Sequence, residues 1–328
     1  MKAPSSQVSA PLRFVRLFCL SLLIWLAACR PTGASPTPRA GDPQPLKVVA
    51  TTTILGDVAR QIGGEAISLT VLLPEGGDPH TYQPTPQDLI EVANADLVLI
   101  NGAGLESFLD RLLENAGEDK VVSVSEGITL RQLQADQPAE NSRSNGRAEH
   151  QDTGLDPHVW FDPQNIKVWV DNIEREMSAR SPVNATTFAA NVQAYQAELD
   201  ALDAWTRDQV ASIPPDNRKL VTDHQNLGYF ADRFGFEQVG AVIPSFSAAA
   251  EPSAEELATL EKAIQALGVP AIFIGTTVSP NLAQRVAADT GAQLVPLYTD
   301  ALTAPDGEAG SYLELMRYDV QAIVEALK

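Results

Sequence analysis

Short apolar runs rich in β-branched residues alternate with helix-like segments along most of the chain, and this alternation limits the possible folds. The runs lie at residues 46–52, 67–73, 96–101 and 120–124, and again at 219–222, 238–243, 271–275 and 293–297. Helix-like segments lie at residues 85–93, 253–267 and 280–289, and the second opens with a Ser253/Glu256 capping pair. This order predicts two similar α/β halves, each with a parallel sheet covered on both faces.

A long amphipathic helix is predicted between the halves, over residues 184–213. Apolar residues recur there in steps of four and three, at Phe188, Val192, Tyr195, Leu199, Leu202 and Trp205. Pro182 precedes the segment, and Pro214 and Pro215 end it. Two interpretations stay open: a continuous helix that joins two lobes and limits hinge opening, or a core helix of one lobe.

The first 29 residues have the features of an export signal. Lys2, Arg13 and Arg16 precede an apolar run at residues 17–26, and the segment has no acidic residue. The run is shorter than the about 20 apolar residues that a membrane-spanning helix needs. The ending Leu-Ala-Ala-Cys resembles a bacterial lipobox, which predicts that Cys29 becomes the lipidated first residue of an extracytoplasmic, membrane-anchored or periplasmic protein. The alternative is an ordinary secretory signal cut near the same small residues.

The charge and the cysteines exclude several classes of function. Removal of the signal changes the formal charge from −19 to about −22, which makes nucleic acid an unsuitable partner. Both cysteines, Cys19 and Cys29, belong to the signal segment. The folded domain of the mature protein therefore has no disulfide, and any metal it binds has nitrogen and oxygen ligands.

The predicted domain organisation follows from these segments. Residues 30–45 form a proline-rich tether, residues 46–183 the first lobe, 184–213 the linker helix and 214–328 the second lobe. Within the first lobe, residues 131–154 are polar and predict a surface loop. His150 lies in this loop, where it either feeds cations toward a site or is simply solvated.

Four candidate metal ligands are spread along the chain. They are His80 in GGDPHTY, His158 in LDPHVWFDP, His224 in VTDHQNLGYF and Asp300 in PLYTDAL. Because these residues follow strand-like runs, and ligands gather beyond the carboxyl ends of parallel strands, we expect the four side chains to meet. Three imidazoles and one carboxylate favour Zn²⁺, whereas Mn²⁺ prefers oxygen ligands.

Structural interpretations compete with this assignment. The Asp-Pro-His tripeptides at residues 78–80 and 156–158 could be simple turns, although their repetition favours ligands. Asp223 stands beside the third histidine and competes with Asp300 as the acidic ligand. Tyr82 and Trp160, each two residues beyond a histidine, either surround the site or belong to the core.

Several longer motifs carry a resemblance that covers nearly the whole chain from Leu46 onward. These are GGDPHTYQPTPQDL, NADLVLINGAGLE, LDPHVWFDPQN, TDHQNLGYFADRFGF, AAEPSAEEL and LYTDAL. With them the chain resembles the zinc- and manganese-binding receptor lipoproteins of bacterial ABC importers. The resemblance implies a monomer with two α/β lobes joined by a long helix, the metal between the lobes, and a membrane permease as partner. His80 and His158 would come from the first lobe, and His224 and Asp300 from the second.

The same resemblance bears on the choice of metal. In this family the third ligand tends to be histidine in zinc receptors and glutamate in many manganese receptors, so His224 favours Zn²⁺. The chain departs from the family at Gly275, where many members carry an acidic residue after the Ile-Phe run. The loop before His158 also lacks the many histidines of some zinc receptors.

The function predicted from the sequence is capture of Zn²⁺ as cargo for an importer, without covalent chemistry. A Mn²⁺ receptor is the alternative within the family. A zinc hydrolase is a rival from another class, but the chain has no HExxH motif, and four protein ligands leave no open position for water or substrate. A surface adhesin with a structural metal is the third hypothesis.

Overall fold

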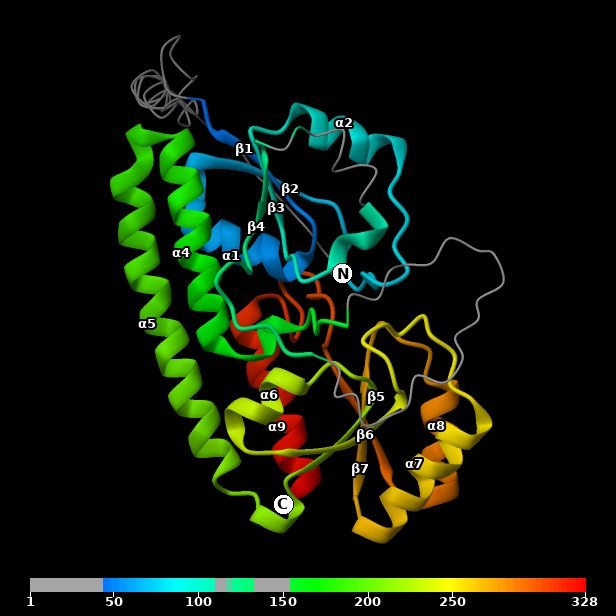
Figure 1. Ribbon diagram of the computed structural model, residues 1–328. Coiled ribbons are helices and arrows are strands. Elements are labelled where there is room, and N and C mark those ends of the chain that lie inside the picture. The colour runs from blue at the N-terminus through cyan, green and yellow to red at the C-terminus, as the bar shows by residue number, and fades with distance from the viewer. Residues whose placement is uncertain (1–43, 110–116, 118, 133–153) are drawn as a thin grey trace, which may run out of the picture. The chain divides into compact units, whose positions relative to one another are not determined.

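Two four-stranded parallel sheets form the framework of the protein (Figure 1). The computed structural model describes residues 44–109, 117, 119–132 and 154–328. The first sheet has the order β2-β1-β3-β4 and contains β1 (Leu46–Ala50), β2 (Ile67–Val71), β3 (Leu97–Ile100) and β4 (Val121–Ser123). The second has the order β6-β5-β7-β8 and contains β5 (Lys219–His224), β6 (Glu237–Ile243), β7 (Ala271–Gly275) and β8 (Gln293–Leu297). The predicted fold class is confirmed.

Helices connect and cover the strands. They are α1 (Thr53–Gly63), α2 (Pro86–Asn94), α4 (Pro163–Arg180), α5 (Ala185–Val210), α6 (Gly228–Phe234), α7 (Ala254–Leu267), α8 (Asn281–Thr290) and α9 (Tyr312–Leu327). Short 3₁₀ helices are η1 (Gly64–Ala66), η2 (Leu105–Leu109), η3 (Val159–Phe161), η4 (Pro182–Asn184) and η5 (Pro215–Asn217). The predicted Ser253/Glu256 capping box starts α7, because the two residues satisfy each other's backbone N–H groups.

Helix α5 occupies the segment for which a long helix was predicted. Its apolar face buries Phe188, Tyr195, Leu199 and Leu202. It contacts α1 and α4 from the first half of the chain and α6 and α9 from the second half, and in Figure 1 it runs alongside both halves. The helix therefore belongs to the core of both halves and connects them, while the exact lobe boundaries stay a prediction.

One continuous apolar core joins the two sheets. Along β7, Ala271 and Phe273 point into this shared core, and the alternating residues Ile272 and Ile274 join a separate cluster beneath α7 and α8. Strand β1 behaves in the same way, with Val48 in the shared core and the next residue in a cluster on the other face. Each sheet is therefore covered on both faces, and the inner faces share one core.

Polar contacts add to this connection between the halves. The backbone N–H of Tyr312 at the start of α9 donates to Asp57 Oδ2 of α1 at 2.9 Å. The backbone N–H of Leu302 donates to the hydroxyl of Thr53 at 2.8 Å. Residues 45–328 accordingly form one compact unit.

Several sequence predictions fall outside the described residues. These are the export signal with Cys29, the tether except its last two residues, and the interior of the polar loop, including His150. Among the described helices, none has the length and apolar character that a membrane crossing requires.

The shared core predicts cooperative unfolding. Leu199→Ala removes a fully buried side chain of α5 and should cost about 2–5 kcal/mol of unfolding free energy. Because the core is continuous, both halves should unfold in a single lowered transition, measured by chemical denaturation with fluorescence and circular dichroism. The matched control is Val183→Ala at a 70% exposed position, which should change the stability by less than about 0.5 kcal/mol. Two separate transitions, with only one of them shifted, would contradict a shared core.

Candidate metal centre

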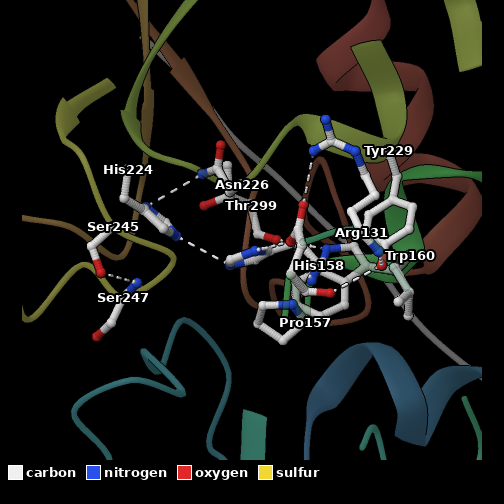
Figure 2. Close-up of polar contacts among 12 residues, drawn as sticks. Arg131, Pro157, His158, Trp160, His224, Asn226, Tyr229, Ser245, Ser247 and Thr299 are labelled. Atoms are coloured by element: carbon white, nitrogen blue, oxygen red, sulfur yellow. Dashed lines mark hydrogen bonds and ion pairs between the residues drawn. The ribbon is translucent and has the colours of Figure 1, made fainter. Parts of the chain in front are cut away.

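The four predicted ligands lie together in the structure. His80, His158, His224 and Asp300 each offer one ligand atom, and these atoms all lie within 4.8 Å of one another. The Nε2 atom of His158 lies 3.4 Å from that of His80 and 3.2 Å from that of His224. Figure 2 shows the rings of His158 and His224 pointing toward each other. This convergence is the geometry that a metal site requires, while metal binding itself stays a prediction.

The four side chains come from strand ends and nearby loops. His80 lies in the connection from β2 to α2, and Asp300 follows β8. Strand β5 extends two residues beyond its predicted end, so His224 is the last residue of the strand. His158 differs from expectation, because it follows no named strand directly and instead precedes the 3₁₀ helix η3. The second sheet thus supplies two of the predicted ligands, from the carboxyl ends of β5 and β8, which lie on either side of β7.

Carboxylates orient two of the imidazole rings. Asp156 Oδ1 lies 2.9 Å from His158 Nδ1, and Asp223 Oδ1 lies 2.9 Å from His224 Nδ1. A carboxylate at Nδ1 places the proton on that nitrogen and leaves the Nε2 lone pair free for a metal. In its neutral form, each ring therefore directs a free nitrogen donor into the cluster.

The two Asp-Pro-His tripeptides are turns, and each carries one of the predicted ligands. Asp78 Oδ1 accepts the backbone N–H of His80 at 2.8 Å, and Asp156 Oδ1 accepts that of His158 at 3.0 Å. Such an aspartate turn fixes the backbone two residues later. The two interpretations of these tripeptides are thus compatible, because the turn directs the histidine into the cluster.

Asp223 is an orienting group in the structure. Its Oδ1 interacts with His224 and accepts a hydrogen bond from Asn226 at 3.2 Å. Its Oδ2 accepts the backbone N–H of Gly275 at 2.7 Å. Because both oxygens are occupied, Asp300 is the carboxylate available to a cation.

Asp300 has the free acceptor that a metal ligand needs. Its Oδ2 accepts hydrogen bonds from the hydroxyls of Thr299 at 2.6 Å and Thr277 at 3.0 Å. Its Oδ1 is buried and has no hydrogen-bond partner among the described residues. A buried acceptor without a partner is costly, and a cation at this position would satisfy it.

The electrostatics of the cluster favour a cation. Burial lowers the pKa of His80 to about 3, with added repulsion from the charges of His224 and His158. Burial also opposes the charged form of His224, but the carboxylates, with Asp223 foremost, raise its pKa to about 9. For Asp300, burial is outweighed by the three histidines, which lower its pKa. At neutral pH the site thus holds a proton on His224 that a metal ion must displace.

Arg131 supports the site in a way that sequence reasoning missed. Its guanidinium lies 3.2 Å from Asp156 Oδ2 and 2.6 Å from Asp232 of α6, as Figure 2 shows in part. Gly228 makes room for it, because a Cβ there would overlap the guanidinium. Arg131 thus compensates the negative charge of Asp156, the carboxylate that orients His158. No local sequence pattern indicates this role, because the two residues are far apart in the sequence.

Trp160 connects two ligand-bearing loops. Its indole N–H donates to the backbone carbonyl of Thr299 at 2.9 Å, and its ring lies 5.2 Å from that of His158 in an edge-on arrangement. It therefore ties the His158 segment to the Asp300 segment. Tyr82 instead donates its hydroxyl to Asp88 of α2 and packs against the outer core of the first sheet.

Comparisons with known proteins point to one family. The family model described as "ZnuA: Zinc-uptake complex component A periplasmic" matches residues 48–326. The manganese-binding lipoprotein MntA of Halalkalibacterium halodurans is 33% identical over 94% of this chain and 98% of the relative. The manganese ABC transporter substrate-binding lipoprotein PsaA of Streptococcus mitis is 31% identical over 95% of this chain and 97% of the relative. The structure of the periplasmic zinc-binding protein TroA of Treponema pallidum matches with a TM-score of 0.74 and 28% identity, over 86% of this chain and 99% of that one.

The indole contact of Trp160 can be tested with a matched pair of variants. Trp160→Phe removes the donor to Thr299 and should weaken metal binding by about tenfold, because the Asp300 segment loses its tie to His158. Trp169→Phe removes an equally buried indole donor, which bonds Ser125 within the first half. Each variant should lose about 1–3 kcal/mol of stability, but only Trp160→Phe should change the metal affinity in a competition titration. Equal affinities for the two variants would contradict the role given to Trp160.

Proposed function

This chain belongs to the ZnuA family of metal ABC transporter substrate-binding proteins, and we propose that it captures Zn²⁺ outside the cytoplasm and delivers it to a membrane permease. The observation that carries the proposal is the convergence of three imidazole nitrogens and one buried carboxylate. The proposed ligands are the Nε2 atoms of His80, His158 and His224 and one oxygen of Asp300.

The donor set and its spacing support zinc as the cargo. Zinc takes four ligands in a tetrahedron at about 2.0–2.1 Å, so two of its nitrogen ligands lie about 3.3 Å apart. The two Nε2 pairs that include His158 lie 3.2 and 3.4 Å apart, close to this separation, and all four ligand atoms lie within 4.8 Å of one another. Three nitrogens with one oxygen also match zinc better than manganese, which prefers oxygen donors. Mn²⁺ is the alternative cargo, because most of the similar proteins, MntA and PsaA among them, are named for manganese.

The family consists of binding proteins, and the chain is not an enzyme. Four protein ligands fill a tetrahedral zinc site and leave no position for an activated water, so the geometry does not favour the hydrolase hypothesis. Capture needs only loss of the ion's water, loss of one proton from the site and formation of four coordinate bonds.

The membrane attachment is also part of the proposal. The related lipoproteins MntA and PsaA support a lipid at Cys29, which would hold the receptor near the permease. Such tethering raises the local concentration of receptor at its partner without any additional contact.

Competitive metal titration tests the proposed ligands. The metal-stripped chain without residues 1–29 should bind one Zn²⁺ tightly and in preference to Mn²⁺. His224→Ala should lower the zinc affinity by more than about 100-fold, because it removes one of four direct ligands, while circular dichroism shows the fold intact. His80→Ala, His158→Ala and Asp300→Ala should also weaken binding strongly.

His150→Ala is the matched control, because it removes the histidine outside the quartet. Its titration should equal that of the unchanged chain. Unchanged zinc binding in His224→Ala would contradict the ligand assignment, and preferential retention of Mn²⁺ would replace zinc with manganese as the cargo. Cell or matrix adhesion that persists in the ligand variants would favour the adhesin hypothesis.

The pKa of His224 predicts how zinc binding depends on pH. Below its pKa of about 9, zinc must displace one proton from His224, so the apparent affinity should rise about tenfold per pH unit. Above about pH 9 the dependence should level off, because the proton is already lost. Calorimetry in buffers of different ionisation enthalpy should show net proton release at about pH 7. A constant affinity between about pH 6.5 and about pH 8.5 would contradict this prediction.

A further inference from the structure

The two carboxylate oxygens of Asp300 have different environments. Oδ2 accepts hydrogen bonds from the hydroxyls of Thr277 and Thr299, whereas Oδ1 has no partner among the described residues. A carboxylate oxygen has two lone-pair positions, so two hydroxyl donors saturate Oδ2. Only Oδ1 then remains for a metal ion.

We propose that Thr277 and Thr299 determine metal specificity by restricting Asp300 to a single metal bond through Oδ1. This inference rests on the proposed function, because it concerns how the same site distinguishes zinc from manganese. The consequence is a site with four donor atoms. Four donors complete the tetrahedron that zinc adopts. Mn²⁺, which prefers more oxygen ligands, loses Asp300 Oδ2 as a second oxygen ligand.

The position of Thr299 is fixed by its neighbours. The residue is 1% exposed, and its carbonyl accepts the indole N–H of Trp160. Its hydroxyl occupies space that Gly275 leaves open, because a Cβ at Gly275 would lie 2.3 Å from Thr299 Oγ1. Any side chain at residue 275 must therefore displace the hydroxyl that holds Asp300.

Thr277 approaches the same oxygen from the turn that follows β7. The backbone N–H of Val278 donates to the carbonyl of Gly275 at 3.1 Å and closes this turn. The next strand holds the turn in place, because the backbone N–H of Thr276 donates to the carbonyl of Leu297 at 2.9 Å. The two hydroxyl donors thus come from separate segments that are each anchored by backbone hydrogen bonds.

The same geometry explains why glycine, and not an acidic residue, suits position 275. An acidic side chain at this position would take the place of the Thr299 hydroxyl and would bring a negative charge toward Asp300, since a Cβ there would already lie 3.5 Å from Asp300 Oδ2. Glycine and the two threonines therefore act as one unit that occupies Oδ2 with neutral donors.

The experiment compares hydroxyl removal with hydroxyl retention. Thr277→Val and Thr299→Val, singly and together, keep a branched side chain of similar shape and remove the donor. Thr277→Ser and Thr299→Ser retain the donor and are the matched controls. The dissociation constants for Zn²⁺ and Mn²⁺ are measured by competition on the full chain without residues 1–29. Co²⁺ replaces zinc in parallel, because its visible absorption is intense in four-coordinate sites and weak in sites of higher coordination.

The valine variants should reduce the preference for Zn²⁺ over Mn²⁺ by about tenfold, and the double variant should show weaker Co²⁺ absorption. The serine variants should keep both the preference and the spectrum. An unchanged metal preference and an unchanged Co²⁺ spectrum in the double valine variant would overturn the inference and leave the proposed function standing. The absence of a tight site in the unsubstituted chain would instead overturn the proposed function itself. Thermal unfolding of each variant shows whether it folds. If the double valine variant does not fold, the metal preference and the Co²⁺ spectrum of the two single valine variants test the inference.

Discussion

The spacing between the carboxyl ends of the two parallel sheets is the constraint on which the metal centre depends. This spacing is set by one apolar core that includes the inner faces of both sheets together with α5 and α9. The hydrogen bond from the backbone N–H of Tyr312 to Asp57 also joins the two halves, and the indole contact from Trp160 to Thr299 joins them beside His158 and Asp300. A site assembled from four distant segments needs this rigidity, because an ion selects ligands by distances that differ by tenths of an ångström.

The charges within the buried site balance a divalent cation. Arg131 compensates Asp156, whereas the buried Asp223 and Asp300 have only histidines as basic partners. With neutral imidazoles these two groups and the partly buried Asp78 leave the site negatively charged, and a divalent ion would offset that charge. Without the ion, the proton on His224 offsets part of this charge, which is why its pKa is raised while that of His80 is lowered. The acidic surface attracts cations of every kind, but only this buried arrangement distinguishes among them.

The sequence predicted those features that depend on local patterns. Strand β7 matches residues 271–275 at both ends, because a strand buried on both faces is a short, continuous apolar run. Strand β8 also matches residues 293–297, although exposed and buried residues are mixed along it. The convergence of the four predicted ligands could be expected because turn and strand-end motifs mark these residues. Trp160 and Thr299 are 139 residues apart in sequence, and Arg131 gains its role from residues of α6 and the His158 turn, so no local pattern could reveal these contacts. The hydroxyl of Thr277 was missed for the same reason, since threonine after a strand is common in turns.

The four predicted ligands are not held by the same number of contacts, and this difference bears on how a bound ion would leave the site. Three of them are fully buried, with His158 and His224 oriented by carboxylates and Asp300 by two hydroxyls. His80 is half-buried in the connection from β2 to α2, and the described residues place no carboxylate at its ring Nδ1. Because opening the shared core would expose apolar surface from both halves, displacement of the His80 segment disturbs far less packing than separation of the lobes. We therefore expect exchange of a bound ion to be least costly on the His80 side of the site.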